Sequence, residues 1–356
     1  MAGFLVICLS FLACPYSHAQ EAVQGIETIG QKVPPEVRTI YRNGLQYLAD
    51  KQKKDGSWPT SSGFGSETAG VAAICTMAFL SSGEDPNFGR YATQIRRGVR
   101  HIILAQNPKS GMFKGNTYDY GFALLLLAEA YGAVDDELLW GDYKGRNKRT
   151  IGEALELAVR AAIVSRKKKK LVHKHWFSTG SSAAAGIPDT SVAGSVMIGL
   201  LAARNAGISV PDHTIELAVD YFEFMTNKDG SVGYMTHPAS AYGNSMARSS
   251  ITTLCLGIAK RKDSKAYKAA RDYIVDNIEL EYDTHLFYGR YYMAQALFQS
   301  DYESWKKWNE LTIRRTRNIQ NEDGSLGKSA YGSNYSTGIS LLGLALNFRI
   351  LPIYER

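Results

Sequence analysis

Cysteine is scarce in this sequence, with four among 356 residues. Cys8 and Cys14 lie in an apolar N-terminal segment, so only Cys75 and Cys255 remain in the body of the chain. A small fold held together by several disulfides is therefore excluded. Both remaining cysteines lie in the middle of apolar segments that are far apart in the chain, and we expect two buried free thiols.

Long apolar runs and nucleotide-binding loops are also missing. Beyond the N-terminus, no uninterrupted apolar run reaches the ~18 residues that a membrane span needs. The sequence has no glycine-rich phosphate loop, no dinucleotide fingerprint and no serine-hydrolase motif. Its net charge of +7 is not accompanied by the interleaved exposed aromatics of nucleic-acid-binding proteins. We therefore expect no transmembrane helix, no nucleic-acid partner and no cofactor.

The N-terminal residues carry a targeting signal. The apolar run 4–14 is followed by the small residues Ser17 and Ala19, which is typical of a secretory signal peptide. We expect residues 1–19 to be removed by cleavage near Ala19, residues 20–34 to form a short extension, and the protein to be exported to the periplasm or the cell exterior. The alternative is a lipoprotein anchored through Cys14.

Positive charge is concentrated in the stretches 146–149 and 166–170. The simplest interpretation of the second stretch, Arg166–Lys170, is a solvated loop. The alternative is binding to an anionic envelope surface, such as lipid headgroups or cell-wall polymer. His173 and His175 follow the lysines, but in this setting a solvated loop is favoured, so the sequence predicts no metal site.

From Pro35 onward the chain alternates two kinds of helical segment with a period of ~50–60 residues. Segments of the first kind have one charged face and are expected at 35–52, 90–106, 150–166, 211–226, 264–278 and 305–320. Segments of the second kind are apolar on all sides and are expected at 67–80, 118–131, 186–207, 248–259, 283–298 and 335–346. A helix that is apolar all round is a buried helix. The alternation predicts an all-α, single-domain (α/α)6 toroid over residues 35–356, with six inner and six outer helices.

Asp-Gly turns follow several of the charged segments, at Asp55, Asp229 and Asp323. Glycine there supplies the positive φ that a helix needs at its C-terminal stop. Aromatic residues follow two of these turns and one further turn, and we expect them to hold each turn against the next repeat; they are Trp58, Phe113 and Tyr234.

The stretch Gln52-Lys-Lys-Asp-Gly-Ser-Trp58 resembles the Gln-to-Trp motif of the prenyltransferase and squalene-oxidase repeat family, which includes the squalene–hopene cyclases. Residues 320–326 and 226–232 are weaker copies of the motif. The resemblance extends over nearly all of the chain from Pro35 and is strongest to the short, secreted, single-toroid members common in planctomycete-type bacteria. It implies a terpenoid-cyclase toroid with a central hydrophobic cavity for an isoprenoid-like ligand, and an activity of the terpene-cyclase or prenyltransferase type.

The family's catalytic motifs are incomplete in this chain. Class II cyclases protonate their substrate with the middle Asp of Asp-x-Asp-Asp, which precedes a Thr; Asp189-Thr190 matches only the last Asp and the Thr. Pro188 stands at the position of the proton donor. The zinc-binding residues of the prenyltransferases have no counterpart in residues 331–338, which contain neither Cys nor His.

Polar residues at the start of the apolar segments are the candidate site residues, because in a toroid these helix N-termini gather at one end. Capping of free N–H groups explains Asp, Ser and Thr there. It does not explain arginine, because a cation opposes the helix dipole at an N-terminus. The candidate catalytic residues are Asp189, His285, Asp119 and Glu67. The candidate ligand-binding residues are Arg248, Arg290, Tyr118, Tyr120, Tyr291, Tyr292, Tyr335 and Trp176.

Three functions remain open on the sequence alone. The first is an isoprenoid-binding or cyclase-like enzyme, in which the arginines pair with the acids or with an anionic ligand and the aromatics line an apolar cavity or contact a carbocation. Simple packing is the alternative role for these aromatics. The second function is a non-catalytic envelope scaffold or binding protein. The third, which depends on fold analogy, is a secreted polysaccharide lyase or hydrolase on a helical toroid.

Overall fold

The computed structural model describes residues 33–61, 69–113, 117–168, 175–177, 189–235, 237–239, 246–280 and 285–351. The predicted signal peptide, its cleavage site near Ala19 and the alternative anchor Cys14 lie outside these residues. Glu67, one of the candidate catalytic residues, also lies outside them.

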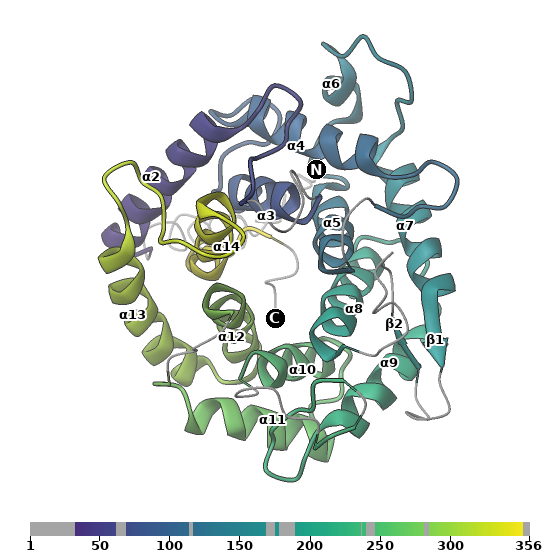
Figure 1. Ribbon diagram of the computed structural model, residues 1–356, viewed down its shortest axis with the longest axis vertical. Helices are drawn as coiled ribbons and strands as arrows, with labels where there is room; N and C mark the ends of the chain where they lie inside the picture. The colour runs from purple at the N-terminus through teal and green to yellow at the C-terminus, as the bar shows by residue number, and fades with distance from the viewer. Residues whose placement is uncertain are drawn as a thin grey trace, which may run out of the picture.

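Six buried helices form an inner ring in the described part of the chain (Figure 1). They are α3 (Ala69–Leu80), α5 (Thr117–Ala130), α8 (Thr190–Asn205), α10 (Met246–Ile258), α12 (Leu286–Ser300) and α14 (Ser333–Leu344). Each inner helix packs against the next, and α14 returns to α3. Every residue of α3 is buried, as expected for a helix without a polar face.

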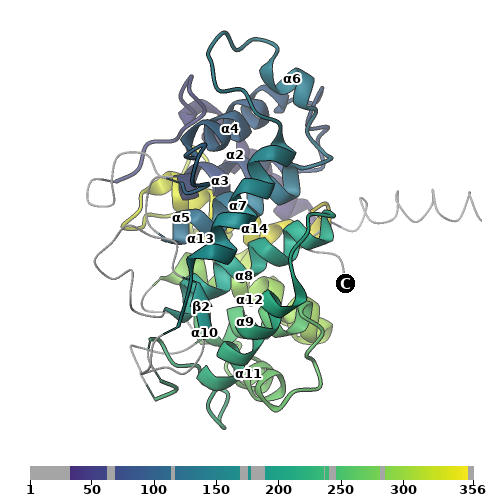
Figure 2. The same cartoon turned by 90° about the vertical axis from the view of Figure 1, so that its right-hand side faces the viewer.

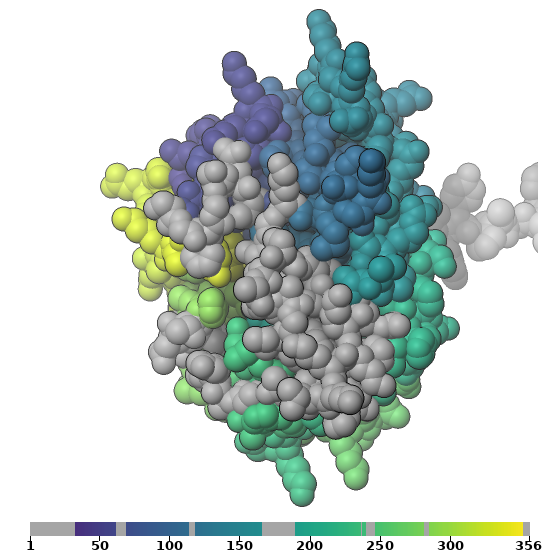
Figure 3. Space-filling view, turned by 45° about the vertical axis from the view of Figure 1, so that its right-hand side comes forward, coloured from purple at the N-terminus to yellow at the C-terminus, as the bar shows by residue number. Residues whose placement is uncertain are grey.

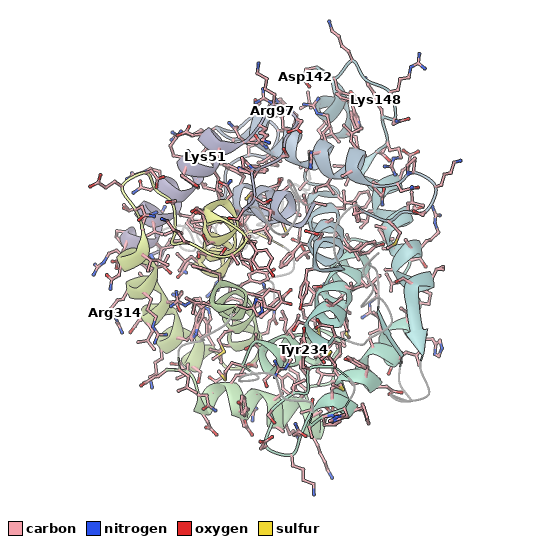
Figure 4. All side chains as sticks on the ribbon, in the orientation of Figure 1. Lys51, Arg97, Asp142, Lys148, Tyr234 and Arg314 are labelled. Carbon is pink, nitrogen blue, oxygen red and sulfur yellow. The ribbon has the colours of Figure 1, made fainter. Side chains whose placement is uncertain are left out.

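Six amphipathic helices surround this ring, as the side view of Figure 2 shows for α7 in front of the inner helices. They are α2 (Pro35–Lys51), α4 (Ala92–Ala105), α7 (Ile151–Ser165), α9 (Asp212–Met225), α11 (Lys265–Asp276) and α13 (Tyr302–Ile319). Charged residues such as Arg314 point away from the ring (Figure 4). The predicted all-α toroid of alternating inner and outer helices is confirmed.

Glycine allows the inner helices to approach one another closely. A Cβ at Gly121 of α5 would lie 2.6 Å from the Cβ of Ser195 in α8, and one at Gly194 of α8 would lie 2.3 Å from Ile251 Cδ1 in α10. Real side chains do not tolerate such distances. These two glycines therefore set the spacing of three consecutive inner helices.

Glutamine side chains join successive outer helices. Gln52, after α2, donates from Nε2 to the carbonyl of Gln94 in α4 at 2.9 Å. Gln106, after α4, donates in the same way to Ala154 in α7 at 2.9 Å. Gln320, after α13, donates to Ile40 in α2 at 3.0 Å and so closes the ring.

The aromatic residues after the turns have a different role from the predicted one. Trp58 donates from Nε1 to Leu48 in its own repeat at 2.8 Å and stacks on Phe79 of α3. Phe113 packs against Tyr120 in the following inner helix, which also belongs to its own repeat. The contact with the next repeat is made instead by the glutamines and by the turn glycines. Gly56 has φ +89°, and a Cβ there would lie 2.0 Å from the carbonyl oxygen of Arg97 in α4.

A short antiparallel hairpin follows α7, with β1 (Arg166–Lys168) paired to β2 (His175–Phe177). The basic stretch that we expected to be a loop therefore begins as a strand. Two further short helices occur, α6 (Asp136–Trp140) and the 3-10 helix η1 (Ala345–Asn347). The segment with α6 projects from the rim of the toroid (Figures 1 and 3).

Two expectations about composition can be compared with the described residues. Cys75 and Cys255 are buried free thiols on α3 and α10, the first and fourth inner helices. None of the described helices is both long enough and apolar enough to cross a membrane.

Candidate active site

The N-terminal end of α8 is organised by Asp189. Its Oδ1 atom accepts hydrogen bonds from the N–H groups of Ser191 at 2.9 Å and Val192 at 3.3 Å. This is the geometry of an N-cap, which satisfies two otherwise free donors. The other carboxylate oxygen remains available for a second interaction.

Tyrosine hydroxyls supply that interaction. The Tyr118 hydroxyl of α5 donates to Asp189 Oδ2 at 3.1 Å, and the side chain of Tyr234 is a further hydrogen-bond partner of Asp189. Burial raises the pKa of Asp189 above its ordinary value, although the hydrogen bonds from Val192, Tyr118 and Ser191 act in the opposite direction. Asp189 consequently keeps its proton to higher pH than an exposed Asp does.

Arg248 supplies the positive charge of this region from the first turn of α10. Its Nε donates to the carbonyl of Val232 at 2.8 Å, and its guanidinium lies over the ring of Tyr234, 5.6 Å from the centroid. Burial lowers the pKa of Arg248, and Asp189 is the charge that most opposes this effect. Burial also raises the pKa of Tyr234 to about 12. Asp189 and Arg248 thus share Tyr234, which lies beside α10 in Figure 4.

Thr190 ties the Tyr234 segment to the start of α8. Its N–H donates to the Tyr234 carbonyl at 3.0 Å, and its Oγ1 donates to the Gly233 carbonyl at 2.8 Å. The same Oγ1 shares a hydrogen bond of 3.1 Å with the hydroxyl of Tyr221, on outer helix α9. The position of Tyr234 is therefore determined by backbone contacts as well as by its side chain.

Aromatic rings from opposite helices meet across the centre of the toroid. In the inner ring α5 and α12 are the second and fifth helices, so they face each other (Figure 1). We call their five rings the aromatic partition: Tyr118, Phe122, Tyr288, Tyr291 and Tyr292. The ring centroids of Tyr118 and Tyr288 are 5.9 Å apart, and those of Phe122 and Tyr291 are 6.0 Å apart. Such distances are typical of aromatic pairs in contact.

The structure brings together five of the predicted site residues and places others elsewhere. Arg248 and Tyr118 interact with Asp189. Tyr118 also belongs to the aromatic partition, together with Tyr291 and Tyr292. Tyr335 is buried, and its ring is tilted against that of Tyr331 with 4.9 Å between the ring centroids. It also helps to raise the pKa of Tyr292. Arg290 is half-buried on α12. Trp176 lies in β2, and its side chain is outside the description.

Tyr120 is separated from Tyr118, the other predicted ligand-binding residue of α5. Tyr120 is buried, and its hydroxyl donates to the carbonyl of Ala158 in outer helix α7. In a helix, residues two apart point in roughly opposite directions. Tyr120 therefore faces outward while Tyr118 and Phe122 face the centre.

Two other candidates take separate positions. Asp119 is buried, and its Oδ1 accepts from the N–H of Gly70 in α3 at 3.0 Å. His285 is exposed, immediately precedes α12 with φ +55°, and makes no side-chain cap. Asp119 thus joins α5 to α3, and His285 lies on the surface.

Sequence analysis missed the deeper polar residues of the ring. Glu129 and Gln295 are 4% and 1% exposed, and they follow the partition residues on the same faces of α5 and α12 at helical spacing. Glu129 was detectable as the one charged side chain in the run 122–130, and Gln295 as the one amide in the run 291–298. No group of three His, Cys, Asp or Glu side chains suited to a metal occurs in the part of the chain that the structure describes.

Comparisons with known proteins agree with this architecture. A model of the family described as "Domain of unknown function (DUF6288)" matches residues 37–308. No curated protein sequence matches the chain significantly.

Solved structures of two enzyme classes share the fold. An inactive variant of the α-1,6-mannanase GH76A of Salegentibacter sp. HEL1_6, in complex with α-1,6-mannotriose, has a TM-score of 0.63 at 10% identity, covering 87% of this chain and 99% of the mannanase. A variant of the type II terpene cyclase MstE from Scytonema, in complex with geranylgeranyl dihydroxybenzoate, has a TM-score of 0.62 at 12% identity, covering 89% and 98%. A glycosidase variant has a TM-score of 0.56 at 13% identity, covering 89% and 98%. At these identities the likeness shows the fold alone.

Proposed function

Because the chain belongs to the family described as the domain of unknown function DUF6288, we propose its function from the geometry around Asp189. The protein binds a small isoprenoid-like molecule at the N-terminal end of its inner helices, and Asp189 protonates a carbon–carbon double bond of that molecule. The activity is of the cyclase or isomerase type.

The observation that carries this proposal is the environment of the Asp189 carboxyl. It is mostly buried, its pKa is raised, and it accepts a hydrogen bond from Tyr118, whose ring belongs to the aromatic partition. A buried carboxyl with a raised pKa keeps its proton to higher pH than an exposed carboxyl does, and a general acid must hold a proton before it can donate it. The acid therefore lies next to aromatic rings, whose faces attract a cation.

The chemistry needs the groups of this region and water. The O–H bond of Asp189 breaks, and its proton adds to one alkene carbon, which leaves a carbocation on the other carbon. Ring faces of the partition favour that cation over water. Loss of a proton from a neighbouring carbon to water forms a new double bond, and Asp189 regains a proton from solvent. No oxidant or reductant is consumed.

The proposal is tested with geraniol in deuterated water. We expect carbon-bound deuterium at the former alkene carbon of the recovered terpenoid, detected by mass spectrometry, with the wild-type protein and none with Asp189→Asn. His285→Ala is the matched control, because His285 is exposed and outside the site, and it should retain the exchange. Equal exchange in wild type and Asp189→Asn would rule out Asp189 as the proton donor.

Glycoside hydrolysis is a second candidate, supported by the fold likeness to a mannanase that holds α-1,6-mannotriose. Glycosidases generally use a pair of carboxyl groups. Among the described residues, Asp119 and Asp189 begin neighbouring inner helices, but Asp119 is hydrogen-bonded toward α3. Release of mannose from α-1,6-mannan oligosaccharides, abolished in both Asp119→Asn and Asp189→Asn, would favour this function over the first.

A non-catalytic envelope-binding role is distinguished by the same variants. It predicts that Asp189→Asn changes neither ligand binding nor any turnover. A scaffold would also show no deuterium exchange in the wild-type protein.

A further inference from the structure

We propose that the aromatic partition limits the ligand beside Asp189 to compact molecules, about the size of one ring or a short isoprenoid, and that Phe122 sets this limit. This inference rests on the proposed function and names the size class of its ligand. It adds a size limit to the central hydrophobic cavity that the family resemblance implies.

The partition begins at the level of the acid itself. Tyr118 donates to Asp189 Oδ2 at 3.1 Å, and Tyr288 of the opposite helix donates to the carbonyl of Ser191, in the first turn of α8, at 3.1 Å. The rings of Tyr118 and Tyr288 are in edge-to-face contact. A ligand that reaches Asp189 therefore meets aromatic rings beside it.

The partition continues one helical turn deeper. Phe122 follows Tyr118 by four residues, which places it roughly 6 Å further along α5. Its ring centroid is 6.5 Å from that of Tyr288 and 6.0 Å from that of Tyr291. Phe122 thus contacts two rings of α12, and removing its ring removes both of these contacts between the two helices.

The walls beside the partition are closed at the same depth. Gly121 brings α5 so close to α8 that a Cβ would lie 2.8 Å from the backbone carbonyl carbon of Ser195. A Cβ at Gly194 of α8 would lie 2.3 Å from the side-chain Cδ1 atom of Ile251 in α10. Among the described residues, a ligand at Asp189 is therefore bounded by ring faces of the partition and by the close approach of α5 to α8.

The experiment compares thermal stabilisation by geraniol and by squalene, each supplied in detergent micelles, for the wild type and for Phe122→Leu and Phe122→Ala. We expect geraniol to raise the Tm of the wild type by a few degrees and squalene to leave it unchanged. In Phe122→Leu and Phe122→Ala, squalene should now raise the Tm. Two variants are used because the alanine variant is the more strongly destabilised.

The matched control is Phe79→Leu, since Phe79 is equally buried but packs on Trp58 and Tyr91 away from the partition. It should lose stability without gaining a response to squalene. A wild-type response to squalene as large as that to geraniol would overturn the size limit and leave the proposed function standing. A gain of response in Phe79→Leu would also overturn it. Absence of any response to either ligand, in every variant, would overturn the proposed function itself.

Discussion

Two aspartates begin neighbouring inner helices and lie in different environments. Asp119, in the first turn of α5, is hydrogen-bonded to the backbone of Gly70 in α3. Asp189, at the start of α8, caps its own helix and also accepts from the Tyr118 side chain. Tyr118 and Asp119 are adjacent in sequence, yet successive helical residues point roughly 100° apart. Asp119 therefore binds the backbone of a neighbouring helix, whereas Asp189 lies among side chains that can share a ligand.

The aromatic partition separates these two environments. The α8 and α10 side contains Asp189, Tyr234 and Arg248, whose charges and hydrogen bonds are coupled. The α3 and α14 side contains Asp119 and Tyr335. We assign chemistry to the first side and helix packing to the second.

The largest expected effect comes from disturbing the contact of Asp119. In Gly70→Ala the new Cβ would lie 2.5 Å from Asp119 Oδ1 and 2.8 Å from its Cα, so the variant should lose about 1–3 kcal/mol of unfolding free energy. Gly257→Ala in α10 is the matched control, because its Cβ meets its nearest neighbour at 3.4 Å. Chemical denaturation should show a loss in the first variant alone. Equal stability of the two would mean that α3 and α5 are not held this closely.

A smaller loss is expected when Tyr118 becomes Phe. The variant removes one hydrogen bond, worth about 0.5–1.5 kcal/mol, and it should raise the pKa of Asp189 because that bond stabilises the carboxylate. Tyr120→Phe, which loses the bond to Ala158, should cost a similar amount of stability. It should leave the Asp189 titration where it was. An equal change in the pKa of Asp189 in Tyr118→Phe and Tyr120→Phe would contradict the separate orientations of the two tyrosines.

The pH dependence of stability distinguishes Asp189 from an ordinary cap. Its pKa is raised in the folded state, so the folded protein binds more protons than the unfolded chain between the unfolded and folded pKa values. Stability contributed by this group therefore falls as pH rises through that window. Asp189→Asn keeps a good capping residue and removes the titration, so its stability relative to wild type should rise over the same window. Urea denaturation at a series of pH values measures the difference, and a relative stability that falls with pH would contradict it.

The smallest effect is expected for His285→Ala. The side chain is exposed and makes no cap, so the unfolding free energy should change by less than about 0.5 kcal/mol. A loss of more than this value in thermal denaturation would place His285 in a contact that the geometry around Asp189 does not require.

The architecture was predictable because the apolar segments have no polar face. Helices such as α3 can only be buried, and amphipathic segments such as α13 can only cover them, so the ring of inner and outer helices follows from the pattern. The predicted ends of the helical segments lie within a few residues of the observed ends. The pairing of Arg166–Lys168 with β2 was not predicted, because three-residue strands leave too few alternations to recognise.

The candidate site was only partly predictable, again because the inner helices have no polar face. A helix that is apolar all round does not reveal which face meets the centre, so Tyr118 and Tyr120 looked equivalent although they point in opposite directions. Tyr221 could not be found because it lies on an outer helix and reaches Thr190 only after folding. Gln295 was visible in the sequence as the one amide in its apolar run, and it was overlooked.

The account depends most on the protonation of Asp189. A titration of its side-chain carboxyl, followed by carbon-13 NMR with Asp189→Asn to assign the signal, measures this directly. We predict a midpoint above the ordinary aspartate value of 3.8 and a further rise in Tyr118→Phe. A midpoint at or below 3.8 would show that Asp189 is ionised as an ordinary helix cap, and it would contradict its role as a proton donor.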